Sequence, residues 1–120
     1  MKKRFIEEIK EILGKRKKEI KSQLLEIGKK SSREKNSYDI TFPDYGRADD
    51  ENADEVSTYV DRLSLKENLE KELSDIDIAL RKIRKGTYGI CESCGKKISE
   101  KRLRVLPTAR FCLKCKNKGL

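Results

Sequence analysis

Apolar residues recur at helical spacing over the first 30 residues of the chain. The apolar positions that follow this spacing are Ile6, Ile9, Ile12, Leu13, Ile20, Leu24 and Ile27. Four of them follow one another at intervals of seven residues, and polar side chains fill most of the remaining positions. A single apolar stripe of this kind is typical of an amphipathic helix that packs against one partner. The pattern therefore predicts a first helix over residues 1–30.

A second stretch, over residues 54–85, repeats the pattern with spacings of three and four residues. The apolar positions that follow this spacing are Val56, Val60, Leu63, Leu69, Leu73, Ile76, Leu80 and Ile83, with a slip of phase near residue 65. Gly86 follows the last of them, and glycine is the usual residue just beyond the C-terminus of a helix. The sequence thus predicts a second long helix that ends before Gly86.

The two predicted helices are similar in length and each has one apolar stripe. The rest of the chain contains no other apolar surface large enough to cover these stripes. We therefore expect a mainly α protein in which the helices pack against each other as an antiparallel coiled-coil hairpin within a monomer. The alternative is that each stripe packs against a second subunit. The expected organisation is a hairpin over residues 1–85 and a small module over 86–120.

A connection of about 23 residues, 31–53, joins the two helices and forms the tip of the expected hairpin. It contains the run Phe42-Pro43-Asp44-Tyr45-Gly46, which favours a turn. From there into the second helix the acidic residues are Asp44, Asp49, Asp50, Glu51, Asp54 and Glu55. Some of these favour a helix N-terminus, where the macrodipole attracts negative charge. One or two acids suffice for that role, so an acidic tip with a further function is expected.

Charge is strongly polarised along the chain. The overall net charge is +9 over 120 residues, but residues 1–35 carry +7, residues 36–80 carry −9 and residues 81–120 carry +11. In a hairpin this distribution gives an acidic tip and a basic base. A basic surface can dock on phosphate groups or on an acidic protein surface. The run Lys15-Arg16-Lys17-Lys18 is equally consistent with a solvated helix face.

Four cysteines in two pairs, separated by 17 residues, indicate a metal site near the C-terminus. The pairs are Cys91-Glu92-Ser93-Cys94 and Cys112-Leu113-Lys114-Cys115. A two-residue spacer lets both thiolates of a pair point at one ion, and four thiolates complete the tetrahedron that structural Zn²⁺ prefers. Gly95 follows the first pair, where the turn of the knuckle calls for a left-handed backbone conformation. One structural zinc ion held by Cys91, Cys94, Cys112 and Cys115 is therefore expected.

Other uses of paired cysteines and other classes of protein are less consistent with this sequence. The N-terminus has no apolar run of signal-peptide length, so we expect a reducing cytoplasm where two disulfides are disfavoured. No βαβ pattern surrounds either pair, which disfavours a redox function of the thioredoxin type. No apolar stretch approaches the roughly 20 residues that cross a bilayer. The chain has no histidine and no nucleophile paired with a base, so we expect no enzymatic activity.

The sequence around the cysteines carries further motifs. It contains Gly86-Thr87-Tyr88-Gly89-Ile90-Cys91, then Arg102-Leu103, and then Pro107-Thr108-Ala109 before the second pair. The apolar residues expected to form a small core are Tyr88, Ile90, Ile98, Leu103, Leu106 and Phe111. Over residues 86–115 this pattern closely resembles the C-terminal zinc finger of the DksA/TraR family, bacterial regulators of RNA polymerase. The helical hairpin with an acidic tip is similar to that family as well.

The resemblance implies a protein that binds RNA polymerase without sequence-specific DNA contacts. In such proteins the coiled coil enters the secondary channel and acidic tip residues approach the catalytic centre. Asp44, Asp49 and Asp50 are the effector residues that this comparison favours. The tip departs from the Asp-x-x-Asp-x-Ala pattern of DksA proteins, because Asp44-Tyr45-Gly46-Arg47-Ala48 supplies only its first aspartate.

Two other functions remain open at this point. A nucleic-acid-binding zinc protein would hold phosphates with its basic helix and finger, and its binding would fall steeply with salt. It gives no role to six acids near the tip. A scaffold hairpin without a catalytic target would tolerate neutralisation of those acids.

Overall fold

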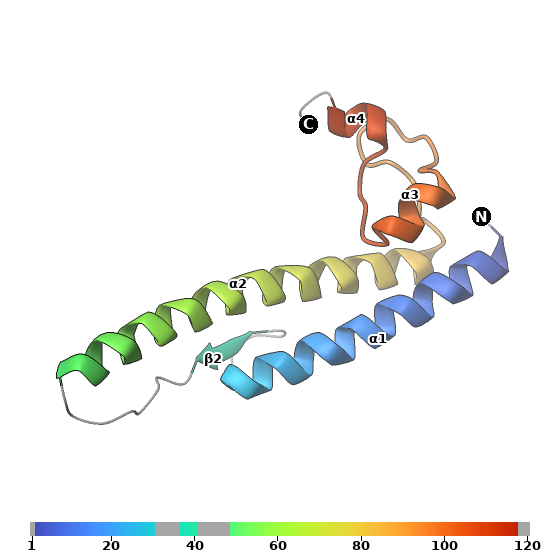
Figure 1. Cartoon of the computed structure of the whole chain (residues 1–120). Coiled ribbons are helices and arrows are strands. Elements are labelled where there is room, and N and C mark those ends of the chain that lie inside the picture. The colour runs from blue at the N-terminus through green and yellow to red at the C-terminus, as the bar shows by residue number, and fades with distance from the viewer. Residues whose placement is uncertain (1, 31–36, 41–48, 118–120) are drawn as a thin grey trace. The chain divides into compact units, whose positions relative to one another are not determined.

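The computed structural model describes residues 2–30, 37–40 and 49–117 and is mainly helical (Figure 1). Its long helices are α1 (Lys3–Ile27) and α2 (Asp49–Lys85). Two short strands, β1 (Gly28–Lys30) and β2 (Tyr38–Ile40), lie between them in the sequence, and two short helices, α3 (Glu100–Val105) and α4 (Leu113–Asn117), follow α2. The expected fold class, a mainly α chain with two long helices and a small C-terminal module, is confirmed.

Helix α1 buries one stripe of apolar side chains, in a phase slightly different from the expected one. The buried positions are Phe5, Ile9, Leu13, Ile20 and Leu24. Their spacing of four and seven residues keeps them on one face of the helix. Ile12 was expected beside this stripe, but it is 48% exposed. Phe5, which the pattern of isoleucines and leucines did not include, takes part in the core instead.

The first helix ends at Ile27, three residues before the expected end, because the chain then forms a strand. Gly28 to Lys30 pairs antiparallel with Tyr38 to Ile40, and Gly28 lies opposite Ile40. A Cβ atom on Gly28 would lie 2.1 Å from the backbone oxygen of Asp39. Only glycine allows this close approach of the two backbones, so the sequence requires glycine at the point where the helix becomes a strand.

Helix α2 begins at Asp49, five residues before the expected start, and ends as expected at Lys85, just before Gly86. The amide of Thr87 donates to the carbonyl of Lys82 at 2.9 Å, and the amide of Gly86 donates to that of Ile83 at 3.2 Å. Gly86 has φ +76°. This pair of bonds with a left-handed glycine is the Schellman motif, which satisfies the last carbonyls of the helix.

The described residues form two compact units, and each contains a stretch of both long helices. The first unit joins α1 up to Arg16 with the residues from Asp75 onward. The second contains the residues from Lys17 to Ser74. The buried apolar side chains of the first unit are Phe5, Ile9, Leu13, Ile76, Ala79, Tyr88, Ile98 and Leu103. Those of the second are Ile20, Leu24, Tyr38, Leu69 and Leu73.

In both units the apolar stripes of α1 and α2 are buried within a single chain, and the two helices run in opposite directions (Figure 1). This confirms the expected intramolecular pairing. The expectation that Val56 and Val60 extend the buried stripe is wrong, because these side chains are 54% and 52% exposed. Over residues 56–85 of α2, the first buried side chain is Leu69, beyond the slip of phase.

In the second unit, strand β2 of the short sheet contacts α2. Tyr38 of β2 is buried, and its backbone amide donates to Oε1 of Glu70 at 3.3 Å. Glu70 forms an ion pair with Lys66, one turn earlier on the same helix, at 3.1 Å. A side chain of α2 thus satisfies a backbone group of β2. The division of the chain at residues 85 and 86 stays a prediction.

Candidate metal centre

The structure brings all four cysteine sulfurs into one cluster. The Sγ atoms of Cys91, Cys94, Cys112 and Cys115 all lie within 4.8 Å of one another, and those of Cys94 and Cys112 are 3.8 Å apart. In a tetrahedral site with Zn–S bonds of about 2.3 Å, the sulfurs are about 3.8 Å from one another. The four thiols are free of disulfide bonds. The donor set and its spacing therefore fit one zinc ion.

The first cysteine pair lies in a tight turn built by its own backbone. The amide of Cys91 donates to the carbonyl of Lys96 at 2.8 Å, and the amide of Gly95 donates back to the carbonyl of Cys91 at 3.0 Å. Gly95 has φ +74°, as expected from its place after the pair. A side chain in this left-handed conformation is strained, which explains why glycine follows the second cysteine. The turn directs both thiols of the pair toward the same point.

The second pair is held by the segment before it and by α4 after it. Nε of Arg102, in α3, donates to the carbonyl of Phe111 at 3.1 Å. Helix α3 itself starts at the N-cap Ser99, whose hydroxyl accepts the amide of Arg102 at 3.2 Å. The amide of Lys116 donates to the carbonyl of Cys112 at 3.0 Å, which begins α4. Arg102 of the expected Arg-Leu step thus positions the chain one residue before Cys112.

A small apolar core supports the metal centre. Tyr88, Ile98 and Leu103 are buried, as expected, and the hydroxyl of Tyr88 donates to the carbonyl of Pro107 at 2.7 Å. Burial raises the pKa of Tyr88 to about 12. Ile90 and Leu106 were expected in this core, but they are 40% and 42% exposed. The core is therefore smaller than the sequence indicated, which leaves more of the module's stability to the metal.

The pKa values of Cys91 and Cys115 are shifted in opposite directions. Burial alone would raise the pKa of Cys91, but hydrogen bonds from the backbone of Cys112, Cys94 and Ser93 to its sulfur lower that pKa to about 6. Hydrogen bonding to Cys112, followed by burial, raises the pKa of Cys115 to about 12. The backbone of the turn thus favours the thiolate at Cys91, and the thiolate is the form that binds a metal.

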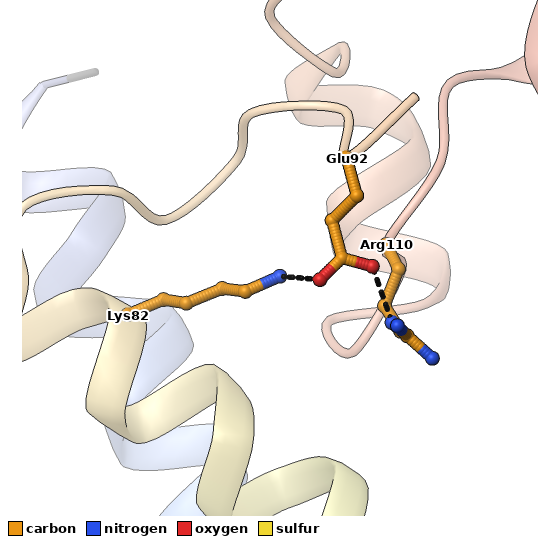
Figure 2. A network of polar contacts seen from close by, with 3 residues as sticks. All are labelled: Lys82, Glu92 and Arg110. Carbon is orange, nitrogen blue, oxygen red and sulfur yellow. Dashed lines mark hydrogen bonds and ion pairs between the residues drawn. The ribbon is translucent and has the colours of Figure 1, made fainter. Parts of the chain in front are cut away.

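Glu92, in the spacer of the first pair, makes contacts that the sequence did not indicate (Figure 2). Its Oε1 lies 3.0 Å from Nζ of Lys82, in α2, and its Oε2 lies 2.5 Å from Nε of Arg110. Partial burial would raise the pKa of Glu92, but hydrogen bonds from Lys82 and Arg110, together with their charge, lower it below the usual range. Residues 81–120 contain two acidic and 13 basic residues. This imbalance is the feature of the sequence that could have indicated ion pairs at Glu92.

Arg104 of α3 contacts the beginning of α1. Its guanidinium carbon lies 5.0 Å from the centroid of the Phe5 ring, and Nη1 lies 3.0 Å from Oε2 of Glu8. A cation over an aromatic face contributes about 0.5–1 kcal/mol at an exposed site, and an exposed ion pair contributes a similar amount or less. These contacts explain why Phe5 is buried although it lies at the start of the chain.

The expected effector residues of the tip lie largely outside the described residues. Asp44 is among the residues that the structure does not describe. Asp49 and Asp50 open α2, but only their backbone is described. The structure therefore confirms that acidic residues begin the second helix and leaves the tip constellation as a prediction.

Comparison with known proteins identifies the family. A model of the prokaryotic dksA/traR C4-type zinc finger matches residues 86–118. The solution structure of the DnaK suppressor protein from Agrobacterium tumefaciens C58 is 31% identical, with a TM-score of 0.57 over 94% of this chain and 92% of that one. The chain belongs to the DksA/TraR family. It therefore carries a C4-type finger with one structural zinc ion.

Other known proteins are similar to this chain over smaller or more divergent regions. Transcription factor DksA2 from Pseudomonas aeruginosa shares the fold, with a TM-score of 0.74 over 99% of this chain at 23% identity. General stress protein 16O from Bacillus subtilis is 32% identical over 74% of the chain. The RNA polymerase-binding transcription factor DksA from Escherichia coli is 41% identical over 46 residues. The matches span 59% and 30% of the lengths of the last two proteins.

No helix in the described part of the chain is both long enough and apolar enough to span a membrane.

Proposed function

We propose that this DksA/TraR protein binds RNA polymerase and modulates initiation of transcription. In this proposal the helical hairpin enters the secondary channel, and acidic residues of the tip act near the catalytic centre. The protein reads no DNA sequence, catalyses no reaction of its own and acts as a monomer in the cytoplasm. Cys91, Cys94, Cys112 and Cys115 hold one structural zinc ion.

The observation that carries the proposal is the similarity to a protein whose name states that it binds RNA polymerase. The two sequences are 41% identical over 46 residues, and this chain shares the DksA fold. Fold alone does not define function, since one fold can serve many sites. The similarity in sequence and the shared two-helix architecture together favour the same class of partner.

The charge distribution supports this partner over bare nucleic acid. Residues 36–80 carry −9 and include the acids at the start of α2, whereas residues 81–120 carry +11. Carboxylates delivered to a polymerase active site can act on its metal ions and basic side chains. A protein that bound only phosphates would be weakened by the same carboxylates.

Binding to purified core RNA polymerase tests the proposal. The full chain, with zinc bound, should co-elute with core enzyme in gel filtration at moderate salt, and an excess of duplex DNA should not remove it. A protein that acts on nucleic acid alone would leave the polymerase fraction when DNA is added and would bind free DNA with a steep dependence on salt. Absence of co-elution would contradict the proposal.

A further inference from the structure

Glu92 joins three segments of the first compact unit (Figure 2). Its side chain contacts Lys82, near the end of α2, and Arg110, which lies two residues before Cys112. Its backbone amide also donates to the carbonyl of Arg110 at 2.9 Å. Glu92 itself lies between Cys91 and Cys94. One residue therefore connects the first cysteine pair, the approach to the second pair, and the helix that supports them.

The two carboxylate oxygens have separate partners. Oε2 accepts a hydrogen bond from Nε of Arg110. This bond and the bond from the Glu92 amide to the Arg110 carbonyl link the segments that carry the two cysteine pairs. Oε1 binds Nζ of Lys82 and links the first pair to α2. The first contact concerns the assembly of the metal site. The second concerns the attachment of the module to the helix.

The module meets α2 next to this carboxylate. Ala79 and Lys82 of α2 face Tyr88 and Arg110 around a cavity of about 10 Å³. Ala79 is 5% exposed, so α2 and the module lie close together here. The hydrogen bonds from Lys82 and Arg110 to the carboxylate of Glu92 are charge-assisted, and bonds of this kind are about twice as strong as neutral ones.

We propose that Glu92 is a positioning residue that holds the two halves of the zinc site together and fixes them to α2. The carboxylate does not bind the metal. It acts through Arg110 on the approach to Cys112 and through Lys82 on α2. Groups outside the metal's own ligands commonly change metal affinity by about 10–100-fold when they are removed, because they orient the ligands. This inference depends on the zinc site and is independent of polymerase binding.

Zinc retention tests the link between the cysteine pairs. Glu92→Gln keeps the size of the side chain and removes its charge, and it should weaken zinc affinity about tenfold in competition with a chromophoric chelator. Glu100→Gln is the matched control, because Glu100 is the other acid of residues 81–120 and is exposed in the first turn of α3. Arg110→Gln should weaken zinc affinity as Glu92→Gln does, and the double variant should lose little more than either single variant.

The attachment to α2 is tested separately. Lys82→Met should leave zinc affinity close to that of the parent and weaken the nuclear Overhauser contacts between the Tyr88 ring and the Ala79 methyl group. Arg84→Met, on the exposed side of the same helical turn, should change neither property. Equal zinc affinity of the Glu92→Gln and Glu100→Gln variants would overturn the proposal, as would additive losses in the Glu92 and Arg110 pair. The Lys82 variant removes the ion pair with Glu92, and the Arg110 variant removes the other ion pair and a guanidinium contact with the Phe111 ring. Both positions lie at the surface, so the two variants test the proposal even where Glu92→Gln folds poorly.

Discussion

The sulfurs of Cys94 and Cys112 lie 3.8 Å apart, although 17 residues separate them in the sequence. This distance is the one that two thiolates adopt around a tetrahedral zinc ion, with Zn–S bonds of about 2.3 Å. The fold of the C-terminal module therefore brings thiols from two separate pairs to the spacing of a zinc site. Its apolar core contains only a few buried side chains, so we expect the metal to supply most of the stability of the module.

Loss of one ligand should therefore release zinc and unfold the module. Cys94→Ser or Cys112→Ser removes a thiolate from a site whose binding free energy is on the order of 10 kcal/mol. Residues 86–117 should lose their dispersed amide signals in nuclear magnetic resonance spectra, and elemental analysis should show less than one zinc per chain. Ser93→Ala, in the spacer of the first pair, should retain zinc. Parent protein purified without chelator that contained no zinc would contradict this prediction.

The stability of the long helices should depend on the buried stripe. Ile76 is 1% exposed, so Ile76→Asp places a carboxylate in an apolar environment and should cost several kcal/mol, a large part of the stability of a small domain. Val60→Asp is the matched control on the same helix, since Val60 is 52% exposed. Thermal unfolding followed by circular dichroism should separate the two variants. Equal midpoints would show that residue 76 does not lie in a packed interface.

Two glycines should respond in opposite ways to alanine. At Gly28 a Cβ atom would lie 2.1 Å from the oxygen of Asp39, so Gly28→Ala must separate β1 from β2 and should cost about 1–3 kcal/mol. At Gly14, within α1, a Cβ atom meets nothing within 4 Å, so Gly14→Ala should add about 0.5–1 kcal/mol through helix propensity. The free energy of unfolding of each variant, measured by chemical denaturation, checks both predictions. A stabilising effect at Gly28 would contradict the strand pairing.

The buried hydroxyl of Tyr88 should make the module sensitive to alkaline pH. Burial raises its pKa from 10.0 to about 12, so the folded state holds the phenolic proton more tightly than the unfolded state does. The corresponding stability is fully present below pH 10 and is lost as the pH rises through about 12. A shift of this size corresponds to roughly 2–3 kcal/mol. Tyr88→Phe should remove the decrease in the free energy of unfolding that Tyr88 causes between these pH values. Denaturation of both proteins at each pH measures this difference.

The metal site and the long helices could be predicted from the sequence because their signals are local. Cys-x-x-Cys spacing fixes the turn, and Gly86 and Gly95 have the left-handed conformations expected beside a helix end and a knuckle. The strand at Gly28 could not be predicted, because it depends on pairing with Tyr38 to Ile40 across the connection. A three-residue strand carries too short a pattern to recognise.

The role of Phe5 and the exposure of Val60 were not predictable for a related reason. Phe5 is buried because Arg104, far away in the sequence, covers its ring. Val60 has the right spacing for the stripe of α2, but no described apolar side chain covers it, and it stays half exposed. Periodicity shows which residues share a face of a helix. It does not show how far along the helix a partner extends.

Transcription by purified RNA polymerase, with a tip variant of this protein, tests the central claim most directly. The combined variant Asp44→Asn, Asp49→Asn and Asp50→Asn removes three charges with little change in shape. Its matched control is Glu11→Gln, Glu26→Gln and Glu67→Gln, which removes three charges from exposed positions of the long helices.

We predict that the tip variant binds polymerase within a few-fold of the parent and loses most of its effect on initiation, whereas the control retains that effect. A tip variant that regulates initiation as well as the parent would contradict the account. So would a variant that ignores polymerase and binds bare DNA more tightly than the parent.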